Sequence, residues 1–171
     1  MSERSERSGE RTRRASAQLF ENHRAVNLAS TVTMIEDMLI ERGYFLNDCR
    51  ADLPGTLRSW KVPKGSAVVR VSLIDRPDFA HLRVASAVFR HPPDVDRVLL
   101  YQDLLQRNAE ICGAAFAVLG DQVVLVSERS TLDLDRSELA DIFTRVQTYA
   151  DDFDDVLVAA YGGELGGDVA A

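Results

Sequence analysis

The chain has 171 residues, of which 46% are hydrophobic and 27% charged, and its net charge is −7. This length suits a single domain with a full hydrophobic core. No apolar run approaches the roughly 20 residues that span a bilayer, and the polar residues 1–14 lack the apolar stretch of a secretory signal. We therefore expect a cytoplasmic protein without a membrane partner.

Charge is distributed unevenly along the chain. Residues 133–171 contain ten acidic residues and two arginines, whereas residues 1–25 contain six arginines and four glutamates. Nucleic-acid binding depends on a basic surface, so the acidic end disfavours a nucleic-acid partner. Because residues 1–25 contain six arginines, nucleic-acid binding is kept as a hypothesis, ranked below the two functions given at the end of this section.

Composition divides the chain into three parts. Residues 1–25 are rich in Arg, Glu and Ser and have little apolar periodicity, which predicts a disordered or frayed polar tail. Residues 26–161 carry the apolar patterns of a folded α+β domain. Residues 162–171 are rich in glycine and are expected to form a flexible tail.

The domain is predicted to begin with a helix over residues 28–42, which ends before Gly43. Its apolar stripe consists of Val32, Ile35, Met38 and Leu39. Three strands of an antiparallel meander are predicted next, over residues 57–62, 67–74 and 81–90. Their alternation of apolar and mixed residues indicates that one face of the sheet is dry.

A central helix is predicted over residues 95–111, with Asp94 as its N-cap. Its apolar stripe is expected to consist of Val95, Val98, Leu99, Leu105 and Ala109. Two strands follow, over residues 114–119 and 122–127, and Gly120-Asp121 between them is typical of a two-residue hairpin turn.

The last predicted element is an amphipathic helix that starts at a capping box formed by Asp135 and Glu138. Its apolar stripe consists of Leu139, Ile142, Phe143, Val146, Tyr149, Phe153, Val156, Leu157 and Ala160. The order is helix, three strands, helix, two strands, helix. This order predicts an α+β fold in which an antiparallel sheet is packed by helices.

No catalytic, cofactor-binding or metal-binding constellation is evident in the sequence. The three histidines lack the spacing of a helical metal pair. Cys49 and Cys112 lie far apart in the sequence without metal-ligand spacing, and we expect both to be reduced thiols. Phosphate-binding glycine loops and a nucleophile elbow are absent. We therefore expect a protein that is not an enzyme and uses no cofactor.

The densest acidic cluster lies towards the end of the last predicted helix. It comprises Asp151, Asp152, Asp154 and Asp155. At least part of it is a solvated helix face, but negative charge near a helix C-terminus is mildly unfavourable, which hints at a partner. These four residues are the candidate partner-binding surface, suited to a basic partner.

Several strand faces stay apolar after one face of the sheet is covered. They carry Val68 and Ile74 on one strand and Ala85, Ala87 and Phe89 on the next. Three helices cannot cover all of this surface, so a second copy of the chain is expected to cover part of it. The sequence leaves open whether the helices or the sheet would form the homodimer.

Three segments of the sequence resemble the YbjN-domain family, whose fold is shared with type III secretion chaperones. They are MIEDMLIERGYFL (34–46), LLYQDLLQRNAEICGAAFAVLGDQVVLVSE (99–128) and LDLDRSELADIFTRVQTYADDFDDVL (132–157). The resemblance implies a bacterial α-β-β-β-α-β-β-α domain, usually dimeric, that binds other proteins. The chaperones hold extended segments of secreted partners, and YbjN members have been labelled sensory-transduction regulators. The family has no catalytic motif to carry over.

Two functions follow from these observations. The first is a non-enzymatic cytoplasmic adaptor or chaperone-like protein, acting as a homodimer, that holds a segment of an unidentified partner protein at a strand edge or sheet face. The alternative is a ligand-responsive regulatory module that binds a small molecule between sheet and helices.

Overall fold

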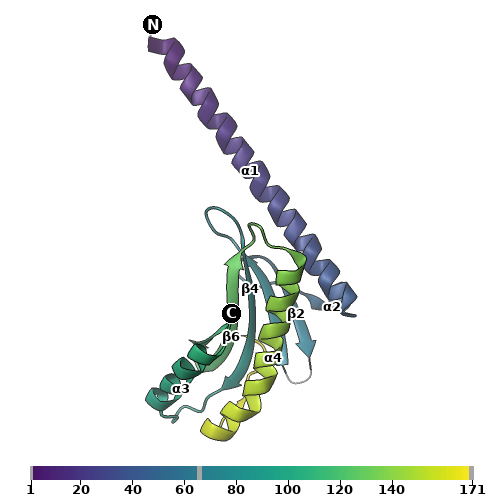
Figure 1. Ribbon diagram of the computed structural model, residues 1–171, viewed down its shortest axis with the longest axis vertical. Helices are drawn as coiled ribbons and strands as arrows, with labels where there is room; N and C mark the ends of the chain where they lie inside the picture. Colours follow the sequence, from purple (N-terminus) through teal and green to yellow (C-terminus); the bar gives the residue numbers. More distant parts are fainter. Residues whose placement is uncertain (1, 65–66, 170–171) are drawn as a thin grey trace.

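The computed structural model describes the backbone of residues 2–64 and 67–169, and the side chains of residues 21–63 and 67–169. It begins with one continuous helix, α1, over Ser2–Glu41. The first half of α1 projects away from the domain, and its last turns contact α2 and α4 (Figure 1). The helix predicted to begin near residue 28 thus extends through the polar N-terminal segment, whose arginines and glutamates are good helix formers.

Two short elements follow α1 that the sequence did not predict. They are the helix α2 (Leu46–Cys49) and the strand β1 (Arg50–Ala51). The three strands of the meander then lie close to their predicted bounds. They are β2 (Thr56–Lys64), β3 (Ala67–Ile74) and β4 (His81–Arg90).

The central helix, α3, covers Arg97–Glu110. Its N-cap is Asp96, whose carboxylate accepts hydrogen bonds from the backbone N–H groups of Val98 and Leu99. The predicted cap, Asp94, is therefore wrong. Asp94 lies in the turn at Pro93, whereas the N-cap is the residue directly before the first helical residue, Arg97.

The predicted apolar stripe of α3 is also wrong. The helix buries Leu100 and Leu104, whereas Val98, Leu99 and Leu105 are exposed. The helix is apolar on two sides, and its contact with β5 decides which side enters the core.

The second half of the domain matches its predicted order. Strands β5 (Ala115–Leu119) and β6 (Gln122–Ser130) form the expected hairpin, in which Gly120 has φ = +64°. The last helix, α4, covers Arg136–Tyr161 and begins with the predicted capping box. In that box Asp135 accepts from the N–H of Glu138, and the Glu138 carboxylate accepts from the N–H of Asp135.

All strands of the described chain belong to one antiparallel sheet with the order β1-β2-β3-β4-β6-β5, and a short strand β7 (Glu164–Leu165) pairs with the end of β4. Helix α4 crosses in front of the sheet (Figure 1). The core fills the space between this sheet face and the helices. Its fully buried members include Ile35, Leu39, Trp60, Val71, Leu73, Val84, Leu100, Leu125, Phe143 and Leu157.

A bulge near the end of β4 changes the face of one aromatic residue. The register with β6 shifts between Ala87 and Phe89, so Phe89 turns into the core and stacks on Tyr161 of α4, with ring centroids 6.4 Å apart. The strict alternation that predicted Phe89 on the opposite face is therefore wrong at this position.

The segment after α4 returns to the sheet. Gly162 ends the helix with φ = +74°, and the next residues pair Leu165 with Phe89 and Glu164 with Arg90. The sequence favoured a flexible tail over residues 162–171, whereas the described part of it, up to Val169, lies against β4 and continues across the sheet.

Candidate functional site

The sheet face opposite the helices carries the other half of the strand side chains, and we call it the open face. Cross-strand neighbours arrange these side chains in rows, such as Lys61 beside Arg70 and Arg70 beside Ala85. The open face is defined by Lys61, Arg70, Ser72, Ile74, Arg83, Ala85, Ala87, Ala117, Val124, Val126 and Glu128.

A groove of about 930 Å³ lies over the open face. Its floor includes small and apolar side chains of the central strands and of β5, among them Ala85, Ala117 and Val126, and the loop of residues 53–56 also lines it. Small side chains on a sheet leave the strand backbone accessible to a chain laid over it. The shape suits an extended peptide segment.

One end of the groove is occupied by a charge cluster centred on Glu128. Its carboxylate accepts hydrogen bonds from Arg83 at 2.7 Å and Arg76 at 3.2 Å, and lies 3.2 Å from Nδ1 of His81. Partial burial would raise the pKa of Glu128, but the hydrogen bond and charge of Arg83, together with hydrogen bonds from Arg76 and His81, hold this pKa below its ordinary value.

The other end of the groove carries a carboxylate-binding pair. Arg70, only 8% exposed, donates from Nη2 to both carboxylate oxygens of Asp168, at 2.6 and 2.7 Å. Lys61 reaches the same carboxylate at 3.0 Å. Partial burial would raise the pKa of Asp168, but the hydrogen bonds from Arg70 and Lys61 outweigh it and the pKa lies below its ordinary value.

The main chain of the same segment is also bound. Gln122 on β6, only 1% exposed, donates from Nε2 to the carbonyl oxygens of Gly166 and Asp168, at 3.0 and 2.8 Å. The N–H of Gly166 donates to the carbonyl of Val88 at 3.1 Å. The open face thus binds both the backbone and a carboxylate of the segment that follows α4.

These contacts were not predicted from the sequence. A possible signal was Arg70, the single charged residue in the apolar run of β3. A second was Asp168, which follows a glycine pair beyond the last helix. Neither signal shows that the two residues meet, because they lie 98 positions apart.

The outer edge of β5 is partly closed by a side chain. The amide of Asn108 accepts from the N–H of Phe116 at 2.7 Å and donates to its carbonyl at 3.4 Å. It therefore occupies the backbone groups that an added strand would use at that position. This favours the open face over the middle of this edge as a peptide site.

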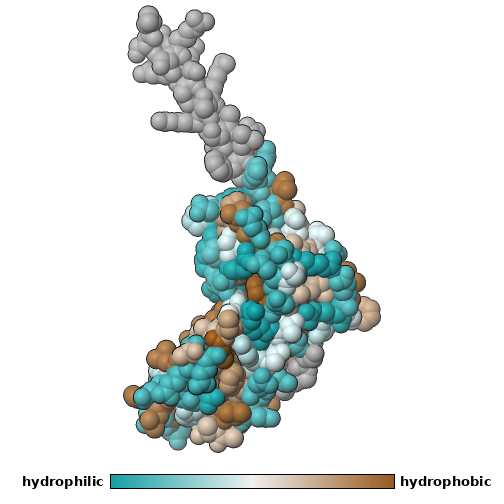
Figure 2. Space-filling model, in the orientation of Figure 1, coloured by the Kyte–Doolittle hydropathy of each residue, from teal (hydrophilic) through white to brown (hydrophobic). Residues whose placement is uncertain are grey.

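Helix α3 presents a second apolar surface. Val98 and Leu105 are 75% and 69% exposed, and Tyr101 and Ala109 lie on the same side. Hydrophobic residues gather over α3 in the space-filling view (Figure 2). An exposed apolar face of this kind is typical of a protein–protein contact.

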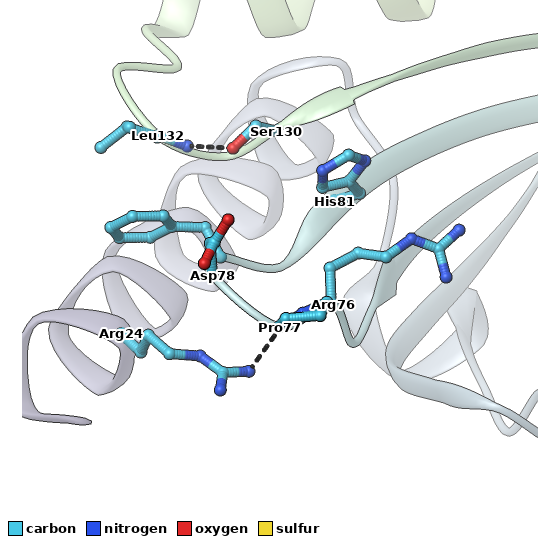
Figure 3. Close-up of a pocket in the computed structure, with 8 residues that line it drawn as sticks. Arg24, Arg76, Pro77, Asp78, His81, Ser130 and Leu132 are labelled. Atoms are coloured by element: carbon cyan, nitrogen blue, oxygen red, sulfur yellow. Dashed lines mark hydrogen bonds between the residues drawn. The ribbon is translucent and has the colours of Figure 1, made fainter. Parts of the chain in front are cut away.

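A smaller pocket of about 650 Å³ lies where α1 meets the β3–β4 turn (Figure 3). Arg24 donates to Asp75 at 2.6 Å and to the carbonyl of Arg76 at 3.0 Å, and Ser130 accepts from the N–H of Leu132. Arg24 thus links α1 to the β3–β4 turn, whereas Arg76 and His81 of the same pocket contact Glu128.

The four aspartates of the predicted partner-binding surface do not share one environment. Asp151, Asp152 and Asp155 are exposed on α4, whereas Asp154 is buried, at 7% exposure. The intervening Phe153 packs edge-on against Phe116, with ring centroids 5.2 Å apart. Three of the four predicted residues therefore lie on an accessible face.

The residues with metal-binding or redox chemistry are dispersed. No group of three or more His, Cys, Asp or Glu side chains among the described residues could hold a metal ion. Cys49 is buried and Cys112 exposed, and both are free. In the described part of the chain, no helix has a stretch long and apolar enough to cross a membrane.

Comparison with known proteins identifies the fold and the family. The structure resembles the Yersinia pestis type III secretion chaperone SycH in complex with a stable fragment of YscM2, with a TM-score of 0.50 and 19% identity over 70% of this chain and 96% of that one. A weaker likeness, with a TM-score of 0.47 and 11% identity, links 58% of this chain to 76% of a chain in the ExsC–ExsE complex. A comparison with curated proteins finds no match.

The sequence evidence covers most of the domain. The family model described as "T3SS (YopN, CesT) and YbjN peptide-binding chaperone 1" matches residues 46–167, a range that includes the sheet and the chain after α4 as far as Gly167. The resemblance drawn from the sequence and the predicted α+β chaperone-like fold are thereby confirmed. The chain belongs to the family of T3SS and YbjN peptide-binding chaperones.

Proposed function

We propose that this protein is a non-enzymatic chaperone or adaptor that holds an extended segment of a partner protein on the open face of its sheet. One observation carries the proposal: the segment 166–169 already lies there, bound through its main chain by Val88 and Gln122. Membership of a peptide-binding family supports the same function. The free thiols of Cys49 and Cys112 support a cytoplasmic site of action.

We further propose that the protein acts as a homodimer. The exposed apolar face of α3 supports this proposal, because self-association is the commonest way in which soluble proteins cover such a face. The open face then remains available for the partner segment in each copy.

The exposed aspartates Asp151, Asp152 and Asp155 remain a second candidate contact surface. Their charge would steer a basic region of the partner towards α4. The alternative of a small molecule between sheet and helices has no observation in its favour. In the described part of the chain that interface is filled by fully buried side chains such as Leu73 and Phe143.

The test is affinity capture from native, nuclease-treated lysate with the full chain and three variants. Val126→Glu places a charge on the floor of the open face, and Ile40→Glu makes the same change at an exposed site on α1. A triple variant replaces Asp151, Asp152 and Asp155 with Asn.

We expect a near-stoichiometric protein partner that is retained by Ile40→Glu and lost by Val126→Glu. Loss with the triple aspartate variant alone would assign the contact to α4 instead. Retention of every partner by Val126→Glu, with the variant folded by circular dichroism, would contradict binding on the open face.

A further inference from the structure

Two glycines of the segment on the open face, residues 162–169, let its backbone lie close to the backbone of β4. A Cβ on Gly166 would lie 2.4 Å from the backbone carbonyl carbon and oxygen of Ala87, and a Cβ on Gly163 would lie 2.1 Å from the carbonyl oxygen of Arg90. Both distances are shorter than any contact that a real Cβ makes. Close approach of two backbones at these positions therefore requires glycine.

The site also favours a negatively charged group beside Arg70. The Arg70 side chain is 10% exposed, and its Nε has no hydrogen-bond partner among the described residues. While the segment covers it, the guanidinium is largely buried, and a buried guanidinium without a carboxylate partner would be unfavourable. An occupant that covers Arg70 as the segment does must therefore bring a carboxylate to the same place.

The segment is attached in a way that permits its release. It begins with two consecutive glycines, Gly162 and Gly163, both with positive φ, and its ladder with β4 is only two residues long. Its fastening is chiefly backbone hydrogen bonds and one ion-pair cluster. Such a short element opens at a low free energy compared with the core strands.

We propose that residues 162–169 act as an internal ligand of the open face, and that a partner binds by presenting the same glycine-x-acidic pattern, as in Gly166-Gly167-Asp168, in their place. This inference rests on the proposed function and specifies its partner and its regulation. While the segment is seated, it competes with the partner at the effective concentration of a tethered ligand, which is about millimolar for a short flexible link.

The probe for this inference is a fluorescein-labelled peptide of sequence YGGELGGDV, which copies residues 161–169. The receptors are the full chain and two full-length variants that weaken the internal segment. Gly166→Val introduces the clash with Ala87, and Asp168→Asn removes the charge that Arg70 binds. Glu164→Gln is the matched control, since it removes one charge from an exposed side chain of the same segment.

Fluorescence anisotropy is expected to show at least tenfold tighter peptide binding by Gly166→Val and Asp168→Asn than by the wild type. The Glu164→Gln receptor should match the wild type. A peptide with Asn in place of its aspartate should bind the released receptors at least tenfold more weakly. A peptide with Gln in place of its glutamate should bind them unchanged.

Equal peptide affinity for wild-type and released receptors, or indifference to the aspartate in the peptide, would overturn the inference. So would an absence of binding to both released receptors, once circular dichroism shows either one folded. The proposed function is judged separately. A captured partner could be lost with Val126→Glu and yet bind the wild type and the released variants equally. That result would support peptide binding on the open face and contradict the role of residues 162–169 as an internal ligand.

Discussion

Arg70 illustrates how a single residue can define a site in an otherwise apolar strand. A buried guanidinium is stable only when paired, and its partner comes from 98 positions away in the sequence. Gln122 likewise binds the main chain of the segment, by donating to the carbonyl oxygens of Gly166 and Asp168. At the residue scale, the open face is therefore a polar recognition site set in an apolar surface.

The pairing of Asp168 predicts a pH-dependent release of the segment. Docking lowers the pKa of this carboxyl, so its contribution is complete above the ordinary value of 3.8 and is lost as the pH falls through the lower docked value. The NMR signal of the Gly166 amide should report this transition in the wild type. The Asp168→Asn variant should lack it, and an identical titration in both proteins would contradict the assignment.

Phe143 provides the corresponding test of the core. Its ring is fully buried on α4, with the guanidinium of Arg42 4.8 Å from the ring centroid. Phe143→Ala is expected to lower the free energy of unfolding by about 3–5 kcal/mol, because it leaves a cavity. Ile40→Ala, at a site that is 54% exposed, should change it by less than about 0.5 kcal/mol. Urea denaturation measures both values, and comparable losses would contradict the placement of α4.

At the scale of elements, α3 differs from the other helices of the domain. Helix α4 buries one continuous stripe, whereas α3 buries Leu100 and Leu104 and exposes a second apolar side. A helix with two apolar sides is stable in water only if the second side is small or covered. For α3 we therefore expect a second copy of the chain to cover it.

Leu105→Glu should separate the homodimer without unfolding the domain. The side chain is 69% exposed, so the substitution leaves the core unchanged but places a charge in the expected interface. Light scattering should report a dimer for the wild type and for Ile40→Glu, and half that mass for Leu105→Glu. A wild-type monomer, or a dimer that withstands the substitution, would rule out this interface.

At the scale of the whole molecule, α1 combines two roles. Its last turns supply Ile35, Met38 and Leu39 to the core, and Arg24 and Asn27 fasten it to the sheet. Its earlier part projects from the domain (Figure 1). Helix α1 is therefore continuous, but only its later part packs against the domain.

Removal of residues 2–20 should leave the domain intact. Among the side chains that the structure describes, those of residues 21–63 and 67–169, the contacts that fasten α1 to the domain begin at Arg24, and the partly buried apolar residues of α1 begin at Leu28. The urea midpoint of a chain that begins at Glu21 is expected to equal that of the wild type, whereas Ile35→Ala should lower it. A large loss of stability on shortening would show that the projecting part also contributes to the fold.

Much of the fold was predictable from the sequence because its signals are local. Period-two and helical spacing predicted all three long strands of the meander, the hairpin and α4, and the capping box at Asp135 depends on residues three positions apart. The family resemblance and the α+β class were predicted on the same patterns and are confirmed.

The remaining features depend on contacts that only the tertiary structure supplies. The choice of the buried side of α3 depends on its contact with β5, and the bulge at Phe89 depends on pairing with β6. The candidate site depends on Arg70, Gln122 and Asp168, which come from three distant segments. The sequence by itself determined the long helices and strands and their order, because these follow from neighbouring residues. The tertiary structure decided which surfaces of these elements pack together, because packing depends on residues far apart in the chain.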